Sequence, residues 1–173
     1  MSNIGAPTLD DWRTSVVRDF AASELFDHTF QEGMELVEQT AAYLDGPGRH
    51  ESKRLSRQAA LDYASESMRL TTRLMQMASW LLVQRAVREG QMAPGEACED
   101  RYRLADDLFK TPPPEHADRL PGGLLALLER AGRLYERALH LDRRMYLEAP
   151  AEEGSHPVRA QHDRLQAAFG GPA

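Results

Sequence analysis

The sequence predicts an all-α protein, an antiparallel three-helix bundle, from three observations. Three stretches carry apolar residues at intervals of three and four, which places those residues on one face of a helix. Glycine and proline separate the stretches, as in short connections between neighbouring helices. No stretch alternates apolar and polar residues as a half-buried strand does. We therefore expect helices over about 22–45, 56–90 and 121–148.

The first long helix is expected from about Ala22 to Asp45. Its apolar stripe consists of Phe26, Phe30, Met34, Val37, Ala41 and Leu44. The Gly-Pro-Gly at 46–48 ends it, because glycine accepts a left-handed cap and proline cannot continue the hydrogen-bond ladder. Upstream, Thr8 followed by Asp11 predicts the cap of a short N-terminal helix.

The second helix is the longest, expected from its N-cap Ser56 to Gly90. Its core face is predicted at Leu70, Leu74, Met77 and Leu81, widened by Met68, Met75, Ala78, Leu82 and Ala86. Trp80, Val83 and Val87 recur on the opposite side, where a surface helix is normally polar. Exposed apolar surface costs about 25 cal/mol per Å², so we expect these three residues to form a patch for self-association or for a partner.

The third helix follows a connector over 91–114, in which three consecutive prolines force extended chain. Pro121 opens this helix, because its missing N–H is not needed in the first turn. The stripe is formed by Leu124, Leu127, Leu128, Ala131, Leu134, Ala138, Leu141 and Met145. We expect a single helical domain over 1–148, with a flexible connector before the third helix, and a disordered or weakly helical tail over 149–173.

Asp142 is unusual because it lies within the apolar stripe of the third helix, where an unpaired carboxylate is costly. In an up-down-up bundle its level falls near Ser67, Arg69 and Thr71 of the second helix. The sequence therefore predicts that Asp142 and Ser67 are buried polar residues with a structural role, and that Asp142 has a hydrogen bond or ion pair at this level.

A basic edge is predicted on the third helix by Arg130, Arg133, Arg137 and Arg144, spaced so that they share one flank. One interpretation is a docking edge for an acidic segment of another protein. A second is a solvated flank with local ion pairs, because acidic residues occupy the other flank. A third, a helical DNA-associated regulatory protein, agrees less well with an acidic chain that has no helix-turn-helix.

Composition limits the classes of function. Of 173 residues, 42% are hydrophobic and 28% charged, and a formal charge of −6 disfavours generic attraction to nucleic acid or anionic membranes. There is no signal peptide and no run of about 20 apolar residues, so we expect a cytoplasmic protein. Cys98 is the sole cysteine, and Glu153 with His156 is the only Glu-x-x-His pair, outside the long helices. We expect no cofactor, no metal and no enzymatic activity.

Five stretches resemble the RcdA family, the alphaproteobacterial regulators of CtrA degradation. They are AAYLDG at 41–46, SESMRLTTRLMQ at 65–76, ASWLLVQRAV at 78–87, RLYER at 133–137 and LDRRMY at 141–146. The resemblance covers most of residues 1–148, and none of its motifs is chemical.

The resemblance implies a three-helix bundle that forms a homodimer and acts as a non-enzymatic adaptor for the ClpXP protease. Members of the family bind ClpXP primed by the response regulator CpdR. They deliver some substrates directly and recruit the cyclic-di-GMP-binding protein PopA to bring in the cell-cycle regulator CtrA. They gather at a cell pole. An adaptor needs two binding surfaces rather than a catalytic group, which agrees with the residue-level analysis.

Overall fold

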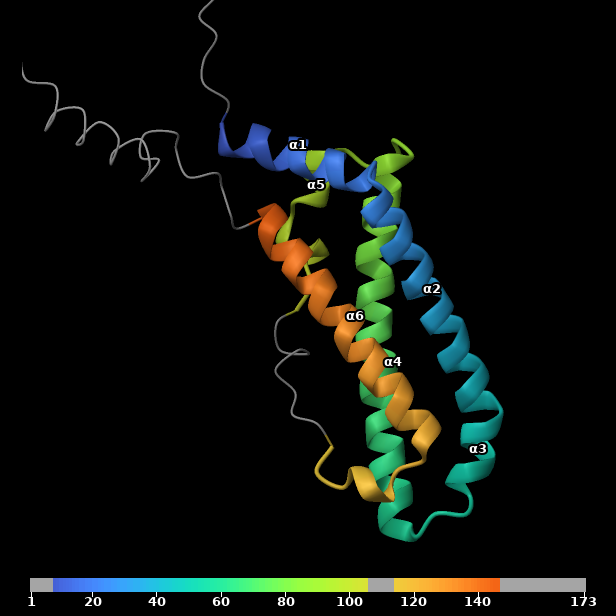
Figure 1. Ribbon diagram of the computed structural model, residues 1–173. Helices are drawn as coiled ribbons and strands as arrows, with labels where there is room; N and C mark the ends of the chain where they lie inside the picture. Colours follow the sequence, from blue (N-terminus) through green and yellow to red (C-terminus); the bar gives the residue numbers. More distant parts are fainter. Residues whose placement is uncertain (1–7, 106–113, 147–173) are drawn as a thin grey trace, which may run out of the picture.

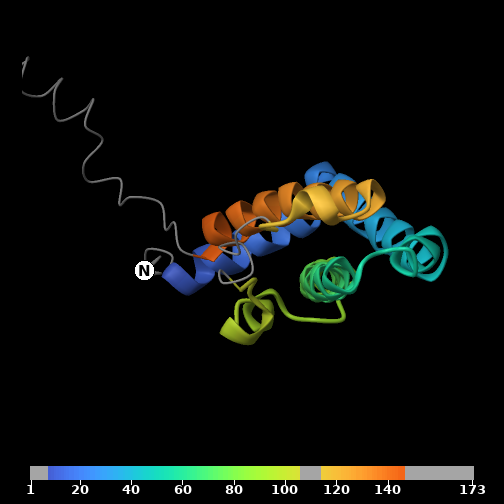
Figure 2. The ribbon, with the colours of Figure 1, turned by 90° about the horizontal axis from the view of Figure 1, so that it is seen from below.

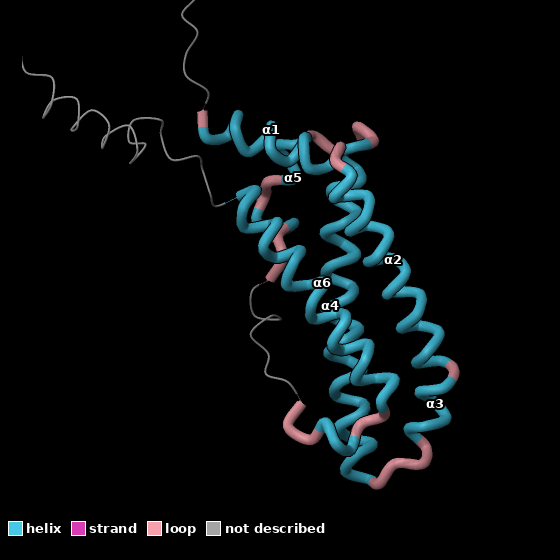
Figure 3. The backbone as a smooth tube through the Cα atoms, viewed as in Figure 1, coloured by secondary structure: helices cyan, strands magenta, loops and turns pink. Residues whose placement is uncertain are grey.

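The computed structural model describes residues 8–105 and 114–146, and in these residues it contains helices and loops but no strand (Figures 1 and 3). The prediction of an all-α protein is confirmed. Three long helices contact one another pairwise: α2 (Glu24–Asp45), α4 (Arg57–Arg88) and α6 (Gly122–Tyr146). Residues 106–113 of the connector predicted over 91–114, and the tail predicted over 149–173, lie outside the described residues.

The direction of α6 differs from the prediction. Residues of α4 and α6 that bond to one another are separated by a nearly constant number of positions, 59 for Gln76 with Tyr135 and 62 for both Trp80 with Asp142 and Gln84 with Tyr146. A nearly constant offset means that the two helices run parallel, and Figure 1 shows both rising from the same end. Only α2 runs antiparallel to its neighbours. The antiparallel prediction was wrong for this pair because the connector between the helices is long enough to return to the starting end.

The ends of the helices follow from their capping residues. Thr8 and Asp11 form a capping box at the start of α1 (Leu9–Ala21), as predicted. Ser23 and Ser56 accept hydrogen bonds from the first turns of α2 and α4. Gly90, with a φ of 71°, takes the left-handed conformation after α4.

The end of α2 differs in detail from the prediction. Gly46 is not left-handed, with φ −108° and ψ −105°. A Cβ there would lie 2.9 Å from the carbonyl oxygen of Ala42, so glycine is required by close contact. The chain then continues into the short α3 (Pro47–Ser52), which begins with proline at its first position.

The core lies between the three long helices and is closed at one end by shorter elements. Its fully buried large hydrophobic side chains include Leu36, Leu70, Met77, Trp80, Leu81, Leu124, Leu134 and Tyr135. Gly33 lets α2 approach α4 closely, because a Cβ at this position would meet Leu81 Cδ1 at 2.6 Å. None of the described helices is long and apolar enough to cross a membrane.

The closed end is formed by α1 together with the segment after α4. This segment contains α5 (Pro94–Ala97) and a 3-10 turn η1 (Asp100–Tyr102), and another 3-10 turn, η3 (Ala117–Arg119), precedes α6. α1 contacts α4, α5 and α6, and Figure 1 shows it crossing their ends. α4 is therefore covered by α1 and α5 as well as by the two other long helices, α2 and α6.

Candidate interaction surface

Asp142 lies completely buried inside the bundle, as its place on the apolar stripe predicted. Its Oδ1 accepts a hydrogen bond from Trp80 Nε1 at 3.0 Å, and its Oδ2 accepts one from Arg103 Nη2 at 3.0 Å. A buried carboxylate is tolerated when its oxygens have donors and a cation lies beside it. The expected partner therefore exists.

The predicted partners of Asp142, at Ser67, Arg69 and Thr71, were wrong. Ser67 is half-buried, and its hydroxyl and that of Thr71 donate to carbonyls of their own helix, while Arg69 forms its ion pair within α4. The physical reason is the parallel course of α4 and α6. It brings Asp142 level with Trp80, near the far end of α4, whereas an antiparallel course would bring it level with Ser67.

The buried polar contacts continue from Asp142 to the segment after α4. The guanidinium of Arg103 lies over the ring of Tyr146, 4.9 Å from its centroid. Burial raises the pKa of Tyr146 to about 12, so its hydroxyl stays protonated and donates to the carbonyl of Ala97 at 3.1 Å. We call Trp80, Arg103, Asp142 and Tyr146 the Asp142 cluster. It holds residues 94–105 against α4 and α6, which is a structural role.

The patch predicted at Trp80, Val83 and Val87 is not an open surface. Trp80 is 2% exposed and Val87 8%, and Val83 is half-buried. The ring of Phe20 from α1 lies 5.7 Å from the indole, and α5 also packs against α4. The prediction of an uncovered face was wrong because α1 and residues 94–105 cover the side of α4 that α2 and α6 leave free.

The uncovered apolar surface of α4 lies elsewhere. Met68 is 72% exposed, Met75 66% and Leu82 51%, although the sequence placed all three in the core. We call this surface the outer face of α4. It comprises Leu61, Ala64, Ser65, Met68, Thr71, Thr72, Met75, Ala78, Ser79 and Leu82. Figure 2, which looks along α4, shows that this helix lies at the edge of the bundle, with α2 and α6 on other sides. The apolar surplus of α4 is therefore real, but it is centred on a different face of the helix from the one predicted.

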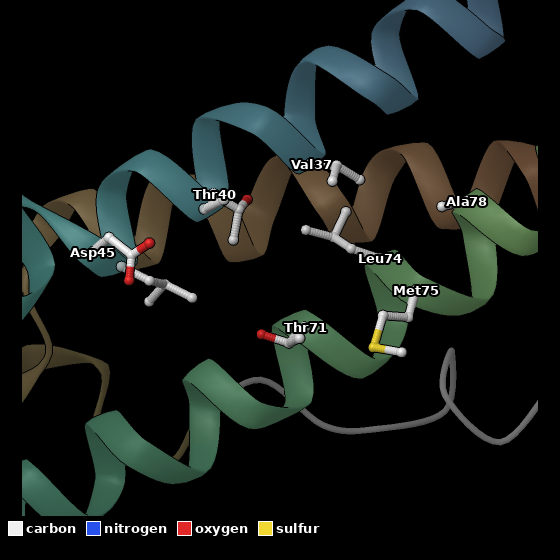
Figure 4. Close-up of a pocket in the computed structure, with 9 residues that line it drawn as sticks. Val37, Thr40, Asp45, Thr71, Leu74, Met75 and Ala78 are labelled. Carbon is white, nitrogen blue, oxygen red and sulfur yellow. The ribbon is translucent and has the colours of Figure 1, made fainter.

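A groove between α2 and α4 borders the outer face. Its volume is about 340 Å³, and it is lined by Val37, Thr40, Ala41, Leu44, Asp45, Thr71, Leu74, Met75 and Ala78. In Figure 4, Val37 and Leu74 point toward one another across it. The predicted stripe of α2 partly lines this groove, so Ala41 is exposed and Val37 half-buried. Apolar surface is thus continuous from the outer face into the groove.

Comparison with known proteins identifies the family. A family described as a protein of unknown function, DUF1465, matches residues 17–169. The crystal structure of RcdA from Caulobacter crescentus CB15 matches with 64% sequence identity, covering 76% of this chain and 99% of that chain, with a TM-score of 0.64. The chain belongs to the RcdA family. No curated protein matches it.

The basic edge of this RcdA family member has local partners. Arg137 forms an ion pair with Glu32 of α2, and Arg133 forms one with Glu129. Arg130 donates to the side chain of Gln39, and Arg144 also has a partner. These arginines remain wholly or partly exposed, but acidic side chains share their surface. The arrangement favours a solvated flank with local ion pairs.

Reactive groups are sparse in the described part of this RcdA family chain. Within residues 8–105 and 114–146, no three His, Cys, Asp or Glu side chains are grouped so that they could hold a metal ion. Burial raises the pKa of the Cys98 thiol, which is opposite to the shift that activates a nucleophile. The Glu153 and His156 pair lies outside the described residues. The outer face of α4 and its groove therefore offer apolar binding surface rather than a reactive centre.

Proposed function

We propose that this chain is a non-enzymatic adaptor that tethers substrates and other adaptors to CpdR-primed ClpXP. The observation that carries the proposal is 64% identity to Caulobacter RcdA over 99% of that chain. At this identity about two thirds of the aligned positions carry the same residue in both chains. CtrA is the proposed regulated substrate, PopA the proposed additional adaptor, and concentration at a cell pole the proposed localisation.

The physical features of the chain support tethering rather than chemistry. In the Asp142 cluster, the carboxylate of Asp142 accepts hydrogen bonds from the indole of Trp80 and the guanidinium of Arg103, so the polar groups of the cluster bind one another. By contrast, the outer face of α4 leaves large apolar side chains in solvent, a feature typical of protein interaction surfaces. A tether acts by raising the effective concentration of a substrate near the protease. It therefore needs exposed binding surface and a stable scaffold.

Reconstituted degradation tests the proposal. Purified ClpXP, CpdR and a substrate are incubated with ATP, with and without this chain, and with PopA and cyclic-di-GMP when CtrA is the substrate. We expect the chain to accelerate substrate loss only when CpdR is present, and to have no proteolytic activity without ClpXP. An unchanged substrate half-life under all these conditions would contradict the proposal.

A further inference from the structure

The groove between α2 and α4 has the length of one face of a short helix. Its lining extends from Val37 to Asp45 on α2 and from Thr71 to Ala78 on α4. At about 1.5 Å per residue these stretches are about 12 Å and about 10 Å long. Three apolar side chains at positions i, i+4 and i+7 of a helix span about 10 Å as well. The groove therefore matches three successive anchors of an amphipathic helix.

The walls of the groove favour a helix over an extended peptide as its occupant. Both walls are helices, which bond their backbone N–H groups internally. The hydroxyl of Thr71 donates to the carbonyl of Ser67 on its own helix. An extended peptide would bury part of its backbone here and find few partners for it, which is costly. A helix brings a backbone that is already hydrogen-bonded, so it loses less on entering the groove.

The side chains in the groove offer apolar contact. Thr40 and Leu74 are the most buried of the lining residues, each 4% exposed. Met75, which is 66% exposed, lies where the groove meets the outer face of α4. A methionine side chain is flexible and polarisable, so it adapts to apolar partners of different shape. The groove is therefore suited to the apolar face of a helix from another protein.

The α2 side of the groove is acidic. α2 contains six Asp or Glu residues and no Lys or Arg. The carboxylate of Asp45 lies at one end of the groove (Figure 4). Glu38 is exposed and shares the flank of Asp45, because it lies seven positions earlier on the helix. In the described part of the chain neither carboxylate forms an ion pair, whereas two other acids of α2 pair with arginines of α4 and α6.

The α4 side of the groove supplies no charge. Between Arg57 and Arg85, the charged residues of α4 are Asp62, Glu66, Arg69 and Arg73. The first three line a pocket with Leu120, just before α6, and Arg73 Nη1 lies 3.6 Å from the position of a Cβ on Gly132 of α6. Charge beside the groove is thus negative and confined to the α2 side. A helix that complements it carries Lys or Arg along one flank only.

We propose that the groove between α2 and α4 binds an amphipathic helix of a partner protein, with apolar side chains in the groove and Lys or Arg beside Glu38 and Asp45. The inference rests on the proposed adaptor function for the partner being a protein, and deepens that function by stating the partner's chemistry. Apolar burial supplies the attraction, and the two carboxylates determine which flank of the bound helix faces α2. A helix with an acidic flank is rejected, because it would bring like charges together.

Fluorescence anisotropy with synthetic peptides tests the partner's chemistry. The probe is a labelled helical peptide with Leu at i, i+4 and i+7 and Lys on one flank, and the comparison peptide has Glu in place of each Lys. We expect the full chain to bind the Lys peptide about tenfold more tightly or better. Glu38→Lys with Asp45→Lys should reverse this preference. The control, Glu35→Lys with Glu136→Lys, changes the net charge equally at exposed residues outside the groove and should keep it. Equal affinity for both peptides, or equal behaviour of both variants, would overturn the proposal.

A matched pair of methionine variants tests the groove itself. Met75 lines the groove, whereas Met68 lies on the same outer face but outside the groove. Met75→Gln is expected to lower the affinity for the Lys peptide about fivefold, and Met68→Gln to leave it unchanged. Far-UV circular dichroism checks that both variants are folded. An equal loss in both variants, or in neither, would overturn the proposal.

Two further readouts separate this proposal from its alternatives. A Met75→Gln variant that changes the sedimentation of the chain but not peptide binding would assign the groove to a second copy and overturn the proposal. Peptide binding is measured without protease, so its failure contradicts the proposed partner and leaves the reconstituted degradation test unaffected. A chain that binds the Lys peptide but does not accelerate degradation would contradict the adaptor function alone.

Discussion

Trp80 donates its indole N–H to Oδ1 of Asp142 at 3.0 Å, and this bond joins α4 to α6 in the interior of the protein. It fixes the two parallel helices in register and gives Oδ1 of the buried carboxylate a donor, while Oδ2 accepts a hydrogen bond from Arg103. It also explains why a tryptophan on a long helix is buried rather than offered to a partner. Several expected outcomes depend on this pair and on the residues around it.

Removing the indole donor should destabilise the fold. Trp80→Phe keeps an aromatic ring beside Phe20 but leaves Asp142 Oδ1 without its donor. A buried acceptor that loses its partner costs about 1–3 kcal/mol, so we expect a loss of this size in the free energy of unfolding by urea. The control is Trp12→Phe, on α1, where the side chain is half-buried. Equal stability of wild type and Trp80→Phe would contradict the importance of this bond.

The buried carboxylate should make stability depend on pH. Burial raises the pKa of Asp142 above its ordinary value of 3.8, an effect larger than the opposing one of Arg103. The folded state then holds its proton at a pH where the unfolded state has lost it, so stability falls as pH rises from about 3.8 through the raised pKa. Asp142→Asn cannot titrate. The difference in unfolding free energy, wild type minus variant, should decrease over this range, and a difference that is flat or increases would contradict the prediction.

Arg103 should hold the segment after α4 in place. Arg103→Gln removes the ion pair with Asp142 and the contact with the ring of Tyr146. We expect faster amide hydrogen exchange over residues 94–105, with exchange in the middle of α2 nearly unchanged, because the loss is local. Arg101→Gln is the matched control, since Arg101 is exposed and pairs with Glu99. Equal exchange in both variants would show that the Arg103 contacts do not fix the segment.

Gly33 should be intolerant of a side chain. A Cβ at this position would lie 2.6 Å from Leu81 Cδ1, whereas one at Gly122 would have no heavy atom within 4 Å. Gly33→Ala should lower the melting temperature, because overpacking a core costs about 1–3 kcal/mol, which exceeds the gain in helix propensity. Gly122→Ala should leave it unchanged or raise it. If both variants melt alike, Leu81 moves aside at little cost.

The sequence predicts the local structure of this chain well and its three-dimensional arrangement less well. Thr8 with Asp11, and Ser56, were sufficient to place helix starts, because a cap is a local feature of the chain. Asp142 was expected to be buried and paired from its position on one helix alone. Its partner was missed because apolar periodicity gives the face of a helix but not the direction of its neighbour.

The same limit explains why the covered and the uncovered apolar faces of α4 were predicted the wrong way round. Trp80 and Met75 are both apolar and lie on different sides of the helix, and no local property of the sequence says which side other elements cover. The deciding contacts come from α1 and from residues 94–105. Seven-residue spacing does not decide between the faces either, because Tyr63, Leu70 and Met77 of the buried face have this spacing as well as Leu61, Met68 and Met75 of the outer face.

The dependence of substrate degradation on the concentration of this chain tests the proposed tethering most directly. With fixed amounts of ClpXP, CpdR and substrate, a tether is predicted to accelerate degradation at low concentration. It should then slow degradation at high concentration, because excess chains occupy protease and substrate separately. Such a maximum is the expected result. A degradation rate that does not change at any concentration of the chain would contradict the adaptor function.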